Sequence, residues 1–441
     1  MAEDRRGVAV SGGDSDSLDI YEKALRAFNI YRGDPVAIID VALADSPDFI
    51  TGEIFRAYMH VGLWEATALA EVQAGLSRLK ALASKSNDRE RAHASALGDW
   101  AAGDWQGMRA RLDRISMDYP RDLLTLQMGH LADFFHGDRD NLRGRVARAL
   151  PAWTPGEDGH SFVLGMQSFG LEECGDYDRA EDVGRRALEI EEEDSWARHA
   201  VAHVMEMQSR QVEGAAFMEE TTAHWAQDDN VFAFHNWWHT ALFYLDQDHV
   251  VRALELYDAA LRPGPDSVQL TLLDASALLW RLYLRGENVG ARWEELATNY
   301  ENMAGSGFYA FNDMHAMMAY SAAGRGAAAE KLLRAVERSA DGDGTNADME
   351  RQVGLPAVLA MAAFGRGDYA GCADFLLPIR YRAHVFGGSH AQRDIIHRTL
   401  IEAALRAGDK SMAGALTQER LALKPDCPYS RSLAARAVTN G

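Results

Sequence analysis

Histidines are concentrated in one stretch of the sequence. Seven of the 15 histidines lie between residues 160 and 249, and four of these form two pairs with i, i+4 spacing. The pairs are His199 with His203 in HAVAH, and His235 with His239 in HNWWH. On a helix this spacing places both rings on one face, about one turn apart. Such a pair can bind one metal ion, as two histidines of a helix do in zinc hydrolases.

Two interpretations of these histidines remain open. In the first, they line a polar groove and make hydrogen bonds to Asp, Asn or water. In the second, they form a catalytic or metal site, because histidine titrates near neutral pH and is the commonest metal ligand. Glu206 lies three residues after His203 on the same helix face and would act as a further ligand or base. The cofactor would then be a divalent zinc, iron or manganese ion.

A short glycine phrase, such as FHGD or GRGD, recurs along the chain and indicates the elements that position these residues. Apolar residues with helical periodicity flank each phrase. The intervals between the glycines are one, two or three multiples of about 34–43 residues, the range of two-helix repeats. The phrase glycines are Gly33, Gly103, Gly137, Gly175, Gly286, Gly324, Gly367 and Gly408.

A small residue recurs five positions after several of these glycines, which is the tetratricopeptide pattern. It is found at Ala180, Ala291, Ala329, Cys372 and Ala413. Glycine adopts the turn conformation at no steric cost, and a small side chain lets the second helix pack closely on the first. We therefore predict an all-α fold, a tetratricopeptide helix-turn-helix superhelix with a central concave pocket.

The expected organisation is one solenoid of about ten to eleven helix pairs over residues 17–430. Residues 1–16 are expected to form a flexible leader, and 431–441 a C-terminal tail. With 45 Lys and Arg against 66 Asp and Glu, the net charge of −21 argues against nucleic acid as a partner. The sequence contains no run of about 20 apolar residues, so it predicts no membrane span. Three widely spaced cysteines indicate a reducing compartment, and we expect a cytoplasmic protein.

The repeat register predicts which side chains face the inner groove. Alignment on Ala253 places His235 and His239 on the groove face of a first helix. Alignment of the preceding unit on Gly214 does the same for the other pair, and a slip of one residue there would rotate that pair by about 100°. His315 takes the same face of a later repeat, and His160 begins the first helix before the histidine pairs. Trp237 is expected in the core, and Trp238 nearer the groove, where it could stack on a flat ligand.

Several phrases resemble the tetratricopeptide repeat protein 38 family over roughly residues 20–430. They include WARHAVAHVMEMQSRQVEGAAFMEE, FHNWWHTALFYLDQDHVVRALELYD, FNDMHAMMAY and GGSHAQRD. The chain departs from the related pattern at His390, where Asn is expected. The resemblance implies a set of recurring groove residues: His199, His203, Glu206, His235, Asn236, His239, Asn312, Asp313, His315, Gln392, Arg393 and Asp394. The excess of 39 Arg over six Lys favours a bacterial member.

Three functions are consistent with these patterns. The first is a binding protein for a small molecule or short peptide, held by the histidines together with His160, Asn236, Trp238, Asn312, Asp313, His315, His390, Gln392 and Arg393. The second is a hydrolase or lyase that uses His199, His203, His235 and His239 for metal binding or proton transfer, with Glu206. The third is a protein–protein scaffold, argued from fold analogy alone. Large helical faces also permit self-association into a homo-oligomer.

Overall fold

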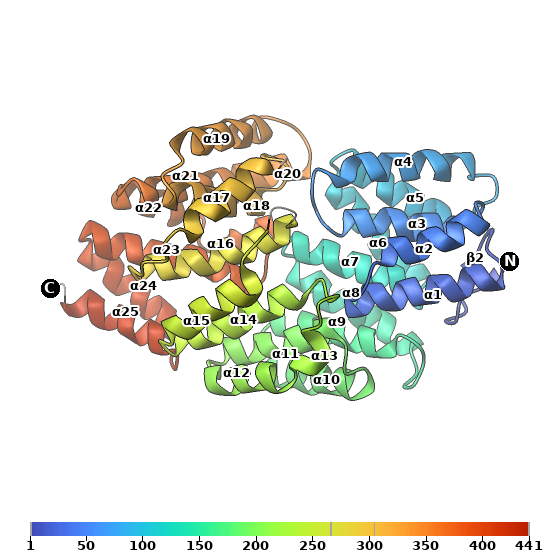
Figure 1. Ribbon diagram of the computed structural model, residues 1–441, viewed down its shortest axis with the longest axis horizontal. Helices are drawn as coiled ribbons and strands as arrows, with labels where there is room; N and C mark the ends of the chain where they lie inside the picture. The colour runs from blue at the N-terminus through green and yellow to red at the C-terminus, as the bar shows by residue number, and fades with distance from the viewer. Residues whose placement is uncertain (1, 265–266, 304, 440–441) are drawn as a thin grey trace. The chain divides into compact units, whose positions relative to one another are not determined.

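The computed structural model describes residues 2–264, 267–303 and 305–439 of the chain. Within these residues the chain is helical apart from one short pair of strands (Figure 1). The helices belong to two compact units. Unit 1 contains residues 1–201 and 222–233, and unit 2 contains residues 202–221 and 234–441. None of the helices in the described ranges is long and apolar enough to cross a membrane.

Unit 1 consists of helices joined by short turns, with consecutive helices packed against each other. Its elements are β1 (Ala2–Glu3), β2 (Ala9–Val10), α1 (Ser15–Ile30), α2 (Pro35–Asp45), α3 (Ile50–Val61), α4 (Ala68–Ala81), α5 (Asp88–Ala101), α6 (Trp105–Asp118), α7 (Leu123–Phe135), α8 (Arg139–Ala149), the 3-10 turn η1 (Leu150–Ala152), α9 (His160–Glu173), α10 (Tyr177–Ile190) and α13 (Thr222–Trp225). Helix α11 (Ser195–Met207) begins in this unit and ends in unit 2.

Unit 2 continues the same arrangement. Its elements are α12 (Gln211–Glu220), α14 (Ala233–Asp246), α15 (Val250–Leu256), the π turn η2 (Tyr257–Leu261), α16 (Gln269–Leu284), α17 (Arg292–Asn302), α18 (Ala310–Ala322), α19 (Gly326–Ala340), α20 (Thr345–Met349), the π turn η3 (Glu350–Gly354), α21 (Leu355–Gly365), α22 (Tyr369–Leu376), the 3-10 turn η4 (Ala383–Phe386), α23 (His390–Ala407), α24 (Lys410–Leu423) and α25 (Pro428–Thr439).

The eight phrase glycines all adopt positive φ, between 60° and 81°, in the turn between the two helices of a pair. This is the left-handed region, which glycine enters at no steric cost. The Asp after the glycine begins the next helix in five of the phrases. Its carboxylate accepts a hydrogen bond from a backbone N–H of the first turn, as at Asp34, Asp104, Asp138, Asp368 and Asp409. The glycine phrase therefore contains both the stop signal and the start signal of the repeat.

The long intervals between phrase glycines contain three further turns that the sequence does not mark with glycine. Trp64, Ser209 and Asp248 take positive φ values of 51°, 59° and 62° at the corresponding positions. Ser209 lies five residues before Gly214, and Asp248 lies five residues before Ala253, so the predicted register of both histidine pairs is confirmed. With these turns, the described residues contain eleven helix pairs followed by α25.

The predicted close packing at the small residues holds in only part of the repeat. Ala180, Ala253, Cys372 and Ala413 are buried, as expected. Ala291, the N-cap residue of α17, is exposed, and Ala329, near the start of α19, is half-buried. At those two positions the pattern therefore predicts the repeat correctly and the packing wrongly.

The two ends of the chain differ from the expected flexible leader and tail. Strands β1 and β2 pair antiparallel, and the buried guanidinium of Arg6 donates to Glu22 of α1 at 2.8 and 2.9 Å. This buried ion pair orders the N-terminal segment. At the other end, α25 extends to Thr439 and packs on α24. Met1, Asn440 and Gly441, which also belong to these predicted segments, lie outside the described residues.

Replacing Gly170 by Ala should destabilise unit 1. Gly170 lies on α9, and an added Cβ would come within 2.8 Å of backbone atoms of Leu142 and Arg143 on α8. Overpacking of this kind costs about 1–3 kcal/mol. Gly98→Ala on α5 is the matched control, because a Cβ there meets nothing within 4 Å and Ala raises helix stability by up to about 1 kcal/mol. Urea unfolding should show the two variants shifting the midpoint in opposite directions.

Candidate functional site

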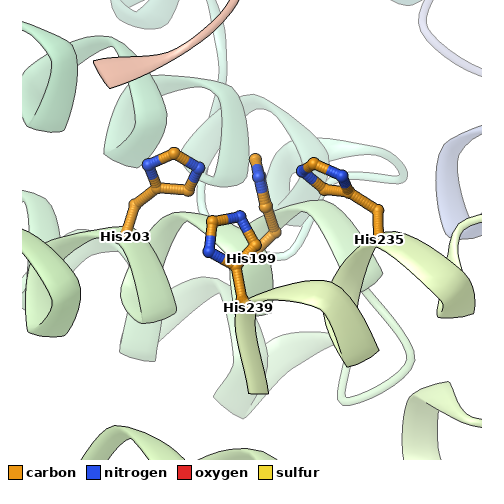
Figure 2. A group of neighbouring side chains, drawn as sticks. All are labelled: His199, His203, His235 and His239. Carbon is orange, nitrogen blue, oxygen red and sulfur yellow. The ribbon is translucent and has the colours of Figure 1, made fainter. Parts of the chain in front are cut away.

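The two predicted histidine pairs come together. His199 and His203 on α11 and His235 and His239 on α14 each offer a ring nitrogen, and these atoms all lie within 4.8 Å of one another. Figure 2 shows the four rings gathered beside the two helices that carry them. The ring centroids of His203 and His239 are 4.4 Å apart, and those of His235 and His239 are 5.0 Å apart. All four side chains are buried, with exposed fractions of 5% or less.

The repeat explains why these rings meet. Helices α11 and α14 are the first helices of consecutive pairs, and the i, i+4 spacing places both rings of each pair on one face. The turns at Ser209 and Asp248 set the register that aims these faces. Nitrogen atoms around one tetrahedral zinc ion lie about 3.4 Å apart, given Zn–N bonds of about 2.1 Å. The four nitrogens, all within 4.8 Å of one another, are therefore near that separation.

Two buried carboxylates orient the histidines of α14. Nδ1 of His235 lies 2.7 Å from Oδ2 of Asp274, and Nδ1 of His239 lies 3.1 Å from Oε2 of Glu206. A carboxylate on Nδ1 holds the proton there and leaves Nε2 as the free electron pair that binds a metal. Glu206, which we expected as a ligand or base, thus contacts His239, and its role as a ligand or base stays a prediction.

His239 is suited to metal binding at neutral pH. Burial, followed by the nearby charges of His235, Arg281 and Lys424, holds its pKa well below the ordinary histidine value. A neutral imidazole binds a metal without first losing a proton, so its affinity does not fall in mildly acidic solution as that of an exposed histidine does.

Asp274 and Arg281 were not identified from the sequence. Both lie on α16, in the apolar stretch QLTLLDASALLWRLYL, and both are buried. Their spacing of seven residues places them on one face of the helix. A lone acid and a lone base on one face of an otherwise apolar helix is the signal that would have found them.

The two tryptophans of HNWWH are placed opposite to the prediction. Trp238 is fully buried, and Trp237 is half-buried. The indole of Trp238 stacks on His235, with centroids 5.4 Å apart and an interplanar angle of 17°. The guanidinium of Arg281 lies over the same indole, 5.2 Å from its centroid. Trp238 is three residues after His235 and therefore packs on that ring, so it is unavailable to an external flat ligand.

The other predicted site residues lie in several places. Asn236 is buried on α14 between the two histidines of that helix, and His160 begins α9 in unit 1. Both stay predictions as ligand-binding residues. Asn312 is half-buried at the start of α18, whereas His315 on the same helix is fully buried and donates through Nδ1 to the carbonyl of Phe311 at 2.8 Å.

The GGSHAQRD residues mainly stabilise the start of α23. Oε1 of Gln392 accepts from the backbone N–H of Ser389, whose hydroxyl accepts from the N–H of Gln392, so the two form a capping box. Arg393 donates to the carbonyl of Gly388, and Asp394 forms ion pairs with arginines of α23 and α24. His390, half-buried, is the first residue of the helix. A ligand role for Gln392, Arg393 and His390 stays a prediction.

Asp313 belongs to a buried carboxyl pair that the sequence did not predict. Its carboxylate accepts from the N–H of Gly307 at 3.0 Å, and Glu350 of the π turn η3 lies within hydrogen-bond reach of it. Burial and the neighbouring negative charge raise the pKa of Glu350 far above its ordinary value. Glu350 therefore keeps its proton at neutral pH, because two neighbouring buried carboxylates cannot both ionise.

No family model matches the chain. Among solved structures, the chain is similar to the human IFIT1 dimer with m7Gppp-AAAA, with 14% identity over 97% of this chain and 95% of that chain and a TM-score of 0.43. It is also similar to yeast Tom70, with 11% identity, coverage of 96% and 88%, and a TM-score of 0.36. For the P58(IPK) TPR domain, the identity is 14%, the coverage 89% and 98%, and the TM-score 0.20. Likenesses at this level transfer no ligand or partner to this chain.

The chain is a tetratricopeptide-type repeat protein. Its own helix pairs, its left-handed turns and the spacing between them define this class. The chain carries a buried group of four histidines on two first helices, with carboxylates on two of them.

Replacing Glu350 by Gln should flatten the dependence of stability on pH. The folded state keeps the Glu350 proton, which the unfolded chain loses above about pH 4.3, so the free energy of unfolding falls as pH rises. Each retained proton contributes a slope of at most about 1.4 kcal/mol per pH unit. Urea midpoints from pH 5.5 to 8.5 should therefore fall less steeply in Glu350→Gln than in the wild type. The exposed Glu330→Gln is the control, and equal slopes for all three proteins would contradict the retained proton of Glu350.

Proposed function

We propose that this protein binds a divalent transition-metal ion at His199, His203, His235 and His239 and presents it to a small molecule or short peptide. The observation that carries the proposal is the convergence of four buried imidazoles from two helices. An all-imidazole set suits zinc and iron better than manganese, which prefers oxygen ligands.

The carboxylates behind the histidines support a metal centre. Metal-binding histidines almost always donate their second N–H to a carboxylate, carbonyl or water. Asp274 and Glu206 stand in this relation to His235 and His239. A groove lined by histidines for hydrogen bonding alone would not require buried carboxylates behind the rings, because those carboxylates must themselves be desolvated.

Metal-dependent catalysis is the second candidate function. A centre in which all four histidines bind the metal is closed and structural, whereas one that uses three leaves a position for water or substrate. In the open form the metal would lower the pKa of bound water and act as a Lewis acid, which is the chemistry of a hydrolase or lyase. The buried carboxylates would then keep the ligating rings oriented through the reaction.

We include four further expectations in this proposal. They are the resemblance to the tetratricopeptide repeat protein 38 family, the bacterial origin, the single solenoid over 17–430 and the cytoplasmic location. The central concave pocket belongs to it as well, as the route by which a ligand would reach the metal. A protein–protein scaffold is the less favoured alternative, because binding to an outer helical face would not require the buried histidines.

Elemental analysis of the purified, untagged protein is expected to find about one equivalent of zinc or iron. His203→Ala and His239→Ala should each lose it, because each removes one ligand of the set. His249→Ala is the matched control, since His249 is exposed and outside the group. A wild type that takes up no metal even after reconstitution would contradict the metal proposal. The remaining hypothesis would then be a binding protein that uses no metal.

Asp274→Asn should weaken metal binding without abolishing it. The amide keeps the shape of the side chain but no longer accepts the Nδ1 proton with a full negative charge, and such changes cost about 10–100-fold in affinity. Competition with a chromophoric chelator measures that ratio. The ion pair of Asp258 with Arg292 provides the control, because Asp258→Asn removes a carboxylate outside the site. Unchanged affinity in Asp274→Asn would show that the His235 contact only supports the fold.

A further inference from the structure

Arg281 is a buried charge in unit 2 that neither the helix repeat nor the metal proposal explains. Its side chain is 2% exposed, on the same face of α16 as Asp274. The guanidinium donates to two backbone carbonyls, those of Ala277 at 2.8 Å and Ala391 at 2.6 Å. Its Nε is buried and has no hydrogen-bond partner among the described residues. A guanidinium with five donors is therefore held rigidly and only partly satisfied.

No carboxylate of the described chain lies within ion-pair distance of Arg281. The acids whose charges reach it are Asp394, Glu206 and Asp246. Each of them contacts another group: Asp394 pairs with Arg420 and Arg398, Asp246 with Arg398, and Glu206 with His239 and Lys424. Arg281 thus has no ion-pair partner of its own among the described residues, and the nearby charge of Arg398 adds to the cost of burying it.

The surroundings of Arg281 connect it to the histidines. Its guanidinium lies over the indole of Trp238, which in turn stacks on His235. Its charge also contributes to lowering the pKa of His239 and of His315, so it is close to both. Nε2 of His315 is buried and has no hydrogen-bond partner among the described residues. Arg281 Nε is therefore a buried donor without an acceptor among the described residues, whereas Nε2 of the neutral His315, whose proton is on Nδ1, is a buried acceptor.

We propose that Arg281 forms a carboxylate-binding subsite beside the histidine group, so that the ligand of this protein is an anionic carboxylate compound. The inference rests on the proposed function, since the metal would bind another part of the same ligand. A carboxylate accepts from a guanidinium in the geometry that an Arg fork offers, and it supplies the charge that the protein itself does not. A ligand carboxylate would also complete the hydrogen bonding of Arg281 Nε.

Calorimetric titration with succinate and with its neutral analogue succinamide tests the subsite. Metal-depleted and cobalt-loaded forms of the full chain are titrated in parallel. Succinate should bind and succinamide should not, because only succinate carries a negative charge that can pair with the Arg281 guanidinium. Arg281→Gln should weaken succinate binding at least tenfold, and Arg281→Lys, which keeps the charge without the fork, should give an intermediate loss. Arg292→Gln removes a surface charge of the same kind and should bind as the wild type does.

A trialanine peptide with a free or an amidated C-terminus separates the two sources of a carboxylate. Binding of the free peptide but not of succinate would identify a peptide terminus as the ligand, and the reverse would identify a small acid. Equal binding of succinate and succinamide, or no binding of any carboxylate, would overturn the subsite. If Arg281→Gln fails to fold, the comparison of charged and neutral ligands in the wild type and in Arg281→Lys still decides.

The two proposals fail in different ways. Carboxylate binding that persists in protein unable to bind cobalt would retain the subsite and remove the metal. A cobalt complex whose absorption spectrum and calorimetry do not respond to any carboxylate would retain the metal and remove the subsite. If a folded Arg281→Gln protein binds succinate as tightly as the wild type, then Arg281 serves only to donate hydrogen bonds to the carbonyls of Ala277 and Ala391.

Discussion

Each helix pair depends on one residue held at positive φ between its two helices. This residue reverses the chain and fixes the rotation of both helices about their axes, and so decides which side chains each helix buries. Eight pairs use glycine, whereas Trp64, Ser209 and Asp248 take the same conformation against the steric preference of their side chains. A shift of one residue at Ser209 or Asp248 would turn a pair of histidines away by about 100°. The histidine group therefore exists because two unfavoured turns are imposed by the packing of the helices around them.

Unit 2 buries ionisable groups mostly in matched sets. His235 with Asp274, His239 with Glu206, and Arg398 with Asp246 each place a proton donor against a carboxylate. At Asp313 and Glu350 the pKa of each carboxyl is raised, because burial makes ionisation costly, and Glu350 stays neutral. Arg281 has no carboxylate within ion-pair distance among the described residues, and for that reason we assign it to a ligand rather than to the fold. Buried groups of this kind are retained at a cost in stability, which favours a role in binding.

The i, i+4 spacing of HAVAH and HNWWH was sufficient to predict two histidine pairs, and the glycine phrase was sufficient to predict the repeat. The partners of those histidines were not predictable. Asp274 is 39 residues after His235, and nothing in one sequence states which helix faces meet at that distance. Trp237 and Trp238 were exchanged for the same reason: adjacent positions differ by about 100° on a helix, and only the neighbouring helix decides which of them is covered.

Local chemistry alone determined the all-α repeat of this protein: glycine enters the left-handed turn freely, Asp caps the next helix, and apolar residues recur with the helical period. The tertiary structure decided what the buried polar residues contact. It assigned Glu206 to His239, Gln392 to the cap of α23, and Arg281 to a position without a carboxylate partner in the described chain. Turns and caps involve residues a few positions apart, so the sequence displays them directly. The partner of a buried charge lies on another helix, and only the packed structure defines the distance between the two groups.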